Sequence, residues 1–197
     1  MTTVASRAAI LTLLAAVMAA TRLHHFGLVP DASWAVFFIG GFYLHRWTRW
    51  AFPLLMALAV LVDWIVIRGQ GLDFWSHYCV SPGYWALVPA YLSLWAGGWW
   101  LQRATQGRLQ WRTLGLLAAS VAVSVAVCHL FAQGGFYWAS SVVAEPTFAG
   151  WWKNYSDWLP IYLRVTAMYV AIAAIAHVAA TRLLSRHDVP AGERAGR

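Results

Sequence analysis

The residues best suited to chemistry lie in one short loop, at positions 74–84. This loop reads FWSHYCVSPGY and separates two apolar runs. Cys79 is the only one of the two cysteines that falls outside a predicted membrane helix. A thiol in such a loop reaches water, can lose its proton and can then bind a metal or attack an electrophile, whereas a cysteine inside an apolar helix is usually a small filler. We therefore expect the functional site at this loop.

Cys79 alone leaves three interpretations open: an inert thiol, a nucleophile for redox or acyl transfer, and a metal ligand. His77 is close enough in sequence to assist deprotonation of the thiol or to act as a second ligand. One cysteine and one histidine are too few for a structural zinc ion, which takes four protein ligands. A metal already held by a macrocycle needs only one axial ligand from the protein. The loop is consistent with that last arrangement.

The composition is typical of an integral membrane protein. The chain has 197 residues, of which 61% are hydrophobic and 11% charged, and it contains 14 tryptophans. Its length accommodates an all-α bundle of about six membrane-spanning helices, because each crossing needs roughly 20 residues. The net charge of +7 resides at the ends of apolar runs and does not indicate nucleic-acid binding. No Gly-x-x-x-x-Gly-Lys-Ser/Thr phosphate loop is present, so an ATP-driven step requires another chain.

Six apolar runs predict six crossings. They cover approximately residues 8–21, 32–44, 53–67, 84–101, 113–133 and 159–184. We expect one transmembrane domain over residues 1–184, a polar, disordered cytoplasmic tail over 185–197, and a long aromatic loop over 134–158. Asp63 lies inside the third run, where an acidic side chain is either a pocket group or the partner of an internal arginine or tyrosine.

The distribution of basic residues predicts the orientation, because lysine and arginine accumulate on the cytoplasmic side of short loops. With six crossings, one side receives Arg7, Arg46, Arg49, Arg103, Arg108, Arg112, Arg182, Arg186, Arg194 and Arg197, and the other receives Arg22, Arg68, Lys153 and at most Arg164. Both termini are thus predicted to be cytoplasmic. The loop with His24 and His25, the Cys79 loop and the long aromatic loop then share the external face.

Aromatic and polar side chains of these three loops suit a large, flat ligand. From chemistry and proximity, the candidate ligand-binding residues are His25, Asp73, His77, Tyr78, Phe136, Tyr137 and Trp138. An alternative is that the aromatic residues only anchor the helices at the membrane interface. Cys128, His129 and His177 lie within apolar runs, and we expect them to be core residues.

The loop HYCVSPGY at 77–84, the stretch PDASW at 30–34, the alanine-rich first run and the six short apolar helices resemble the BtuM-type vitamin B12 transporters. These are relatives of the substrate-binding S-components of energy-coupling factor transporters. The resemblance covers most of the chain, and the two quoted stretches are its most specific parts.

The resemblance implies a six-helix S-component fold and cobalamin uptake across the inner membrane. Cys79 would be the axial ligand of the cobalt at the external face, and Tyr84 would line the corrin pocket. A further hypothesis is that Cys79, with an external reductant, assists removal of cyanide from cyanocobalamin. Pairs of alanines in the first helix would meet a membrane-embedded coupling subunit that works with two ATPases, namely Ala15/Ala19 or Ala16/Ala20.

Two other function classes stay open. The first is a membrane enzyme with Cys79 as nucleophile and His77, His24 or His25 as base; it would also need an orienting group and an oxyanion site. The second is a haem-binding or metal-ion-binding membrane protein with the same three histidines as ligands. The identity of the ligand that the purified protein retains discriminates among these classes.

Overall fold

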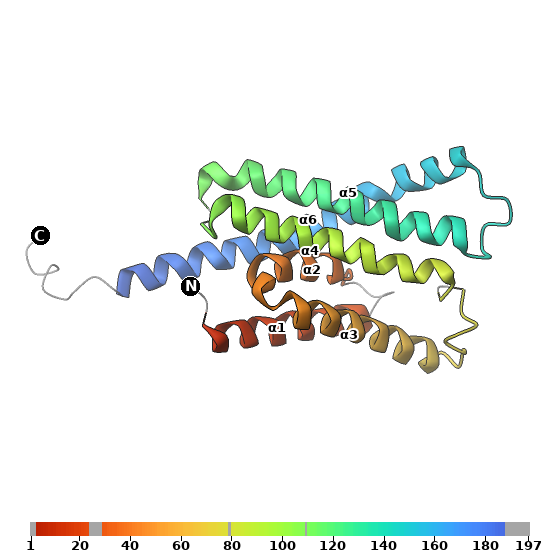
Figure 1. Ribbon diagram of the computed structural model, residues 1–197, viewed down its shortest axis with the longest axis horizontal. Helices are drawn as coiled ribbons and strands as arrows, with labels where there is room; N and C mark the ends of the chain where they lie inside the picture. Colours follow the sequence, from red (N-terminus) through yellow and green to blue (C-terminus); the bar gives the residue numbers. More distant parts are fainter. Residues whose placement is uncertain (1–2, 24–28, 79, 109, 188–197) are drawn as a thin grey trace, which may run out of the picture.

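The computed structural model describes residues 3–23, 29–78, 80–108 and 110–187, and these residues form an all-helical bundle without a β-strand (Figure 1). The α-helices are α1 (Val4–Leu23), α2 (Ser33–Leu44), α3 (Thr48–Gly69), α4 (Leu87–Thr105), α5 (Leu114–Ala139) and α6 (Phe148–His187). Three short 3-10 helices connect them: η1 (His45–Trp47), η2 (Pro82–Ala86) and η3 (Trp111–Thr113). The expected all-α class is confirmed.

Four stretches of the described chain are long and apolar enough to cross a membrane. They are Val4–Leu23, Ser33–Gly69, Leu114–Ala139 and Phe148–Arg182, and the second comprises α2, η1 and α3. Each has at least the roughly 20 residues that a helix needs to cross a bilayer core. The chain therefore has the character of a membrane protein, while six crossings and their orientation stay predictions.

The short helix α2 lies at the centre of the bundle. Ten of its 12 residues are buried, including Phe37 and Phe38. A helix that is apolar on all sides is stable only when other helices surround it. α2 contacts α1, α3, α4 and α6, and Figure 1 shows it between the α1–α3 pair and the α4–α5 pair.

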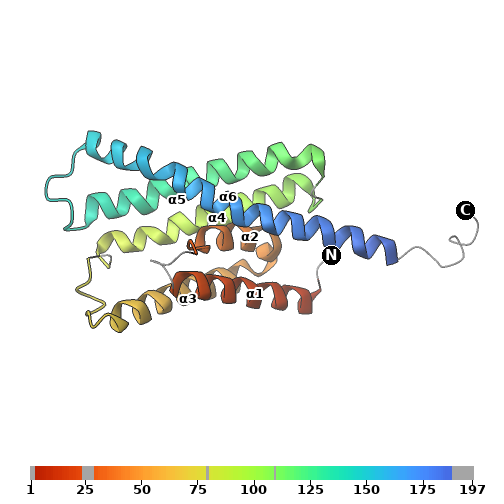
Figure 2. The same ribbon diagram turned by 180° about the vertical axis from the view of Figure 1, so that it is seen from behind.

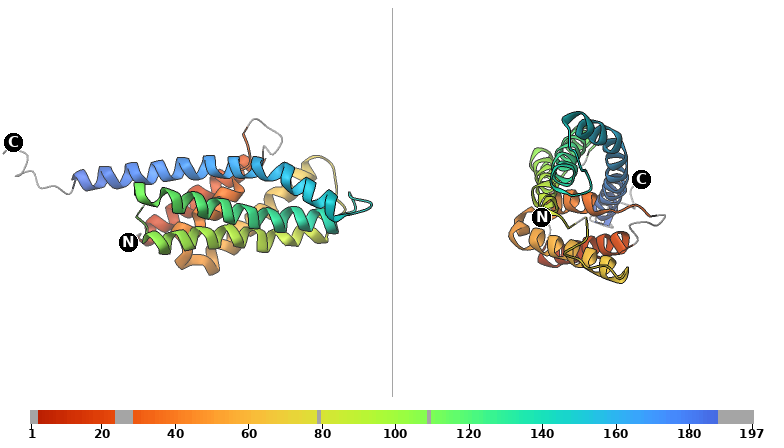
Figure 3. Two further views of the ribbon diagram at one scale, coloured as in Figure 1. Left: turned by 90° about the horizontal axis from the view of Figure 1, so that it is seen from above. Right: turned by 90° about the vertical axis from the view of Figure 1, so that its right-hand side faces the viewer.

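The remaining helices form a cover around α2. α6 is the longest, with 40 residues, and it crosses the back of the bundle and extends past its end (Figures 2 and 3). α1 begins and α6 ends at the same end of the bundle, and the α3–α4 and α5–α6 connections lie at the opposite end (Figure 1). This places the 70–84 connection and the 140–147 connection together.

Glycines bring α2 and α4 into direct backbone contact. A Cβ atom added at Gly98 of α4 would overlap the carbonyl oxygen of Phe38, and one added at Gly41 of α2 would overlap that of Trp95. Small residues at helix crossings allow such close approach in membrane proteins. The position of α4, which carries the Cys79 loop at its N-terminal end, thus depends on these two glycines.

The predicted long loop over residues 134–158 is wrong. α5 continues to Ala139 and α6 already begins at Phe148, so the connection is short. The Gly134–Gly135 pair does not end α5, because Gly135 packs closely against Gly83 of η2. Tertiary packing here outweighs the low helix propensity of glycine.

Other predicted boundaries also shift. α3 begins at Thr48 and contains Pro53, whereas the sequence favoured a start at that proline. Tyr84 belongs to η2, and Pro89 lies in the first turn of α4, where a missing N–H leaves no helical hydrogen bond unmade. α6 contains Pro160 and continues to His187, so the first residues of the predicted tail are helical; residues 188–197 lie outside the described residues.

We predict that Gly98→Ala lowers the thermal stability of the protein in detergent. The added methyl group overlaps the Phe38 carbonyl oxygen, and overpacking of a close contact costs about 1–3 kcal/mol. Circular dichroism at increasing temperature measures the effect. Gly115→Ala is the matched control, because a Cβ atom there meets nothing within 4 Å. Equal unfolding temperatures for the two variants would contradict the α2–α4 packing.

Candidate functional site

A partly open cavity of about 460 Å³ lies where α1, α3, η2 and α5 meet. Its volume falls in the range of ligand pockets, roughly 300–1,000 Å³. The lining residues are Arg22, Asp63, Val66, Ile67, Gln70, Leu72, His77, Tyr78, Gly83, Tyr84, Leu87, Ala132 and Phe136. The cavity thus combines an apolar wall with a few charged and polar groups.

The 74–84 loop forms one wall of this cavity. Turn-type hydrogen bonds fold it back on itself: the Val80 amide donates to the His77 carbonyl at 2.8 Å, and the Tyr84 amide donates to the Ser81 carbonyl at 2.8 Å. Pro82 begins η2, where its fixed φ suits the first helical position. Cys79 lies outside the described residues, but residues on both sides of it line the cavity.

Two glycines seat this loop on α5. A Cβ atom at Gly83 would overlap the carbonyl oxygen of Gly135, and a Cβ atom at Gly135 would lie within 2.9 Å of the Gly83 carbonyl oxygen. The two backbones are therefore in direct contact. As a result, η2, which carries the lining residues Gly83 and Tyr84, is fixed relative to the α5 face that carries Ala132 and Phe136.

The charged floor of the cavity is the ion pair of Arg22 and Asp63. Arg22 Nε donates to Asp63 Oδ1 at 2.7 Å, and Arg22 Nη2 donates to Asp63 Oδ2 at 2.7 Å. Both side chains are largely buried, with 10% and 19% of their surface exposed. This two-bond geometry is the strong form of an arginine–carboxylate contact. It ties the last turn of α1 to the C-terminal half of α3.

The third guanidinium nitrogen of Arg22 extends the network to two further elements. Nη1 contacts Asp31 Oδ2 at 3.2 Å, Ser33 Oγ at 3.1 Å and Tyr91 Oη at 3.3 Å. Asp31 in turn accepts hydrogen bonds from the Ser33 amide and hydroxyl at 2.9 and 2.6 Å. Arg22 therefore joins α1, the start of α2, α3 and α4.

Tyr84 connects the cysteine loop to this network. Its hydroxyl donates to Asp63 Oδ2 at 2.7 Å. Burial first, and then the adjacent Asp63 carboxylate, raise the pKa of Tyr84 well above its usual value. The phenol therefore stays protonated and continues to donate throughout the physiological pH range. Asp63, for which the sequence left two roles open, fills both: it lines the cavity and pairs with an arginine and a tyrosine.

Four of the sequence-predicted residues meet at the cavity: His77, Tyr78, Tyr84 and Phe136. The ring centroids of His77 and Tyr78 are 4.4 Å apart, and those of Tyr78 and Phe136 are 6.4 Å apart. Phe136 reaches the cavity from α5 and not from a loop, which corrects the predicted reason for its position.

Three other predicted residues do not line the cavity. Asp73 is half exposed, lies 3.8 Å from Arg68 and accepts the Ser76 amide, so it serves the turn after α3. Tyr137 is buried and its hydroxyl accepts the Thr147 amide at 3.3 Å, which closes the α5–α6 connection. Trp138 is exposed and packs against the Tyr137 ring. The remaining candidate, His25, lies outside the described residues.

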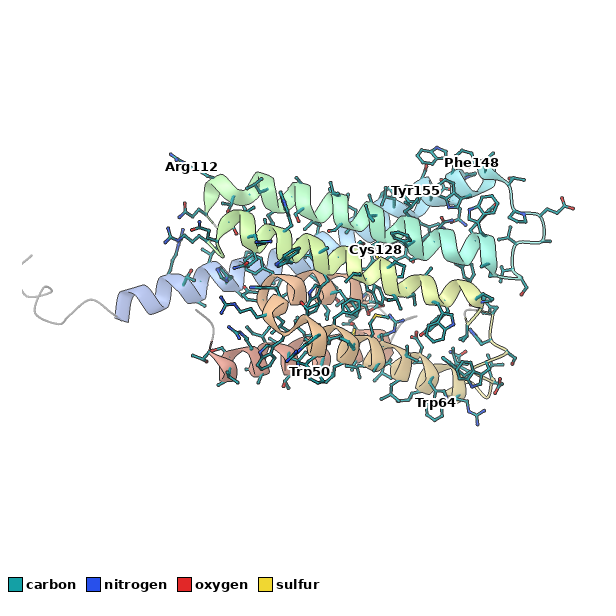
Figure 4. All side chains as sticks on the ribbon, viewed as in Figure 1. Trp50, Trp64, Arg112, Cys128, Phe148 and Tyr155 are labelled. Atoms are coloured by element: carbon teal, nitrogen blue, oxygen red, sulfur yellow. The ribbon has the colours of Figure 1, made fainter. Side chains whose placement is uncertain are left out.

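Cys128 and His129 are core residues, as expected, whereas His177 is only partly buried. Cys128 is fully buried in the middle of α5 (Figure 4). His129 Nε2 contacts the Tyr155 carbonyl oxygen at 3.1 Å, and His177 Nδ1 contacts the Tyr43 hydroxyl at 2.6 Å. Within the described ranges, no group of three or more His, Cys, Asp or Glu residues is arranged to hold a metal ion.

Sequence reasoning missed Arg22 and Gln70 as cavity residues. Arg22 was placed in an external loop, but it belongs to the last turn of α1 and is 8% exposed. The available signal was the acidic residue at membrane depth: a buried carboxylate needs a partner, and an arginine next to an apolar run can supply one. Gln70 follows directly after α3 and carries no such signal.

Comparison with other proteins gives no assignment. No model of a known protein family matches this sequence, and no curated protein matches it.

We predict that Asp63→Asn strongly destabilises the protein. The change removes the negative charge on α3 that pairs with Arg22 of α1. Breaking a buried ion pair in this way costs about 3–5 kcal/mol. Reversible unfolding in mixed micelles, followed by tryptophan fluorescence, measures the loss. The control is Asp157→Asn, which breaks the exposed pair with Lys153 at 2.6 Å and should cost less than about 1 kcal/mol. Similar losses in both variants would show that the Arg22 network is not a structural centre.

Proposed function

We propose that this chain binds cobalamin at the cavity beneath the 74–84 loop and serves its uptake across a bacterial inner membrane. The observation that carries the proposal is that residues on both sides of Cys79 line a ligand-sized cavity. The bundle offers four helices long and apolar enough to cross a membrane. A binding site at one end of such a bundle suits a substrate that must cross the membrane.

Cys79 is the proposed axial ligand of the cobalt. Cobalt in a corrinoid already has four ring nitrogens as ligands, so the protein needs to supply only one group. A thiolate from the cavity wall provides that group and selects cobalt corrinoids over other flat molecules. His77 and Tyr78, which directly precede Cys79 in the sequence, line the cavity and are proposed to border the macrocycle.

The other lining groups suit the periphery of a corrinoid, which carries several carboxamides. Gln70 offers an acceptor oxygen and an N–H donor, and Asp63 retains one acceptor site on Oδ1 beside its bonds to Arg22 and Tyr84. Tyr78 and Phe136 offer aromatic faces to the apolar parts of the ring. Cobalamin is larger than the cavity. Its corrin ring would therefore lie at the open side of the cavity, and the rest of the molecule would lie outside the bundle.

Energy for uptake is proposed to come from ATPases on other chains, because this sequence has no phosphate loop of its own. The proposed contact with a coupling subunit is on α1. Ala16 and Ala20 are exposed on this helix, whereas Ala15 and Ala19 are half-buried within the bundle. The exposed pair is therefore the one proposed to dock, since small residues allow another membrane helix to approach.

We predict that purified protein incubated with cyanocobalamin and freed of excess ligand retains a corrinoid whose visible spectrum is shifted. In Cys79→Ala the shift disappears, because a thiolate no longer coordinates the cobalt. The control is Ser76→Ala, an exposed position of the same loop. This variant should keep the shifted spectrum.

A colourless wild-type protein would overturn the cobalamin proposal and favour a membrane thiol enzyme. Retention of haem instead of corrinoid would favour the haem-binding alternative. A further variant, Cys79→Ser, tests the hypothesis of cyanide removal: with a reductant present, cyanide release that is equally fast in wild type and Cys79→Ser would exclude a role for the thiol.

We predict that Ala16→Leu abolishes cobalamin uptake by cells but leaves binding by the purified protein intact. The larger side chain prevents close approach of a partner helix without entering the cavity. Ala171→Leu, at an exposed position of α6, is the matched control and should not affect uptake. Normal uptake by Ala16→Leu would count against docking through α1.

A further inference from the structure

A second, separate groove lies between α4 and α5. Its volume is about 420 Å³, and its walls come from both helices: Ser93, Ala96, Gly97, Trp100, Ala119, Ser120, Val123, Ser124 and Val127. The rim is open to the outside of the bundle, since Val123 is 64% and Trp100 is 50% exposed. None of these residues lines the cavity beneath the 74–84 loop.

Small side chains and internal hydrogen bonds make this groove both deep and apolar. A Cβ atom at Gly97 would lie 2.7 Å from that of Ser124, so no larger residue fits at the floor. The hydroxyl of Ser120 donates to the Gly97 carbonyl at 2.8 Å, and that of Ser124 donates to the Ser120 carbonyl at 2.6 Å. Because these hydroxyl protons are already used, the groove offers hydrocarbon contacts rather than polar recognition.

The groove lies at membrane depth. Residues 119–127 are the middle of α5, which is one of the helices long and apolar enough to cross a membrane. On α4 the lining extends from Ser93 to Trp100, which corresponds to about 10 Å along the helix axis. In a bilayer, the molecules next to such a surface are lipid acyl chains.

Arginines follow the groove at one end only. Arg103 lies one turn beyond Trp100, and its guanidinium carbon is 5.0 Å from the centroid of the Trp99 ring. Arg112 precedes α5 and lies at the end of the bundle where α1 begins (Figure 4), and Arg108 lies between them in sequence. The sequence has no acidic residue between positions 74 and 144. This end of the groove is therefore positively charged.

We propose that the α4–α5 groove binds an anionic phospholipid, with an acyl chain along the groove and the phosphate at Arg103 and Arg112. An apolar groove that ends at positively charged arginines is complementary to a lipid with an apolar chain and an anionic head group. A docked apolar helix would use the small residues but not the arginines. The proposal is independent of cobalamin, because the two sites share no residue.

Native mass spectrometry of the purified full-length protein tests the acyl-chain part of the proposal. The protein is stripped of lipid in detergent and titrated with phosphatidylglycerol or with phosphatidylcholine of the same chains. Val123→Trp fills the groove from an exposed position and should reduce binding of both lipids at least tenfold. The matched control is Leu130→Trp, an exposed position of α5 outside the groove, which should bind as the wild type does.

The head-group part is tested with Arg103→Gln/Arg112→Gln. Each arginine near an anionic surface contributes about 1 kcal/mol, so wild type should prefer phosphatidylglycerol roughly 30-fold and the double variant should lose this preference. Equal affinities of wild type for the two lipids, or equal lipid binding by Val123→Trp and Leu130→Trp, would overturn the proposal. A wild-type dimer that Val123→Trp converts to monomer, with lipid binding unchanged, would instead assign the groove to a second copy of the chain.

Discussion

The structure depends most on the buried ion pair between Arg22 and Asp63. A guanidinium in an apolar bundle is stable only when its charge and its donors are satisfied, and here four elements contribute to that: α1 provides the arginine, α3 the carboxylate, the start of α2 a second carboxylate, and α4 a tyrosine hydroxyl. The same carboxylate accepts the Tyr84 hydroxyl. The ion pair therefore connects the helices to one another and also to the loop that forms one wall of the cavity.

Backbone contacts through glycine set the remaining geometry. Gly98 lets α4 rest on α2, and Gly83 lets the cysteine loop rest on Gly135 of α5. Contacts of this kind leave no side chain to readjust, so the positions of the helices are sharply defined. The cavity thus has two fixed walls and a polar floor, which is the pre-organised arrangement that ligand pockets usually show.

The sequence predicted the helical class and the residue range of α2 well, about 32–44 against Ser33–Leu44, because apolar runs bounded by polar residues have few alternatives. Its central place in the bundle was not predicted. It also led to the cavity through Tyr84 and Tyr78, since polar residues between apolar runs must lie at an end of the bundle. It failed at Gly134–Gly135 and at Pro53, where packing outweighs local propensity. For Arg22 the only sequence signal was Asp63 at membrane depth, which calls for a partner but does not identify it, because the burial of Arg22 depends on two carboxylates, 9 and 41 positions away.

The unequal lengths of the helices have a consequence for bilayer thickness. α6, with 40 residues, is about 60 Å long, twice the roughly 30 Å of a hydrocarbon core, whereas α1, with 20 residues, just spans it. α6 therefore has helical residues to spare beyond one crossing, but α1 has none. A thinner or thicker membrane would therefore shift or tilt α1 first. Such hydrophobic mismatch would displace the last turn of α1, where Arg22 connects the elements around the cavity.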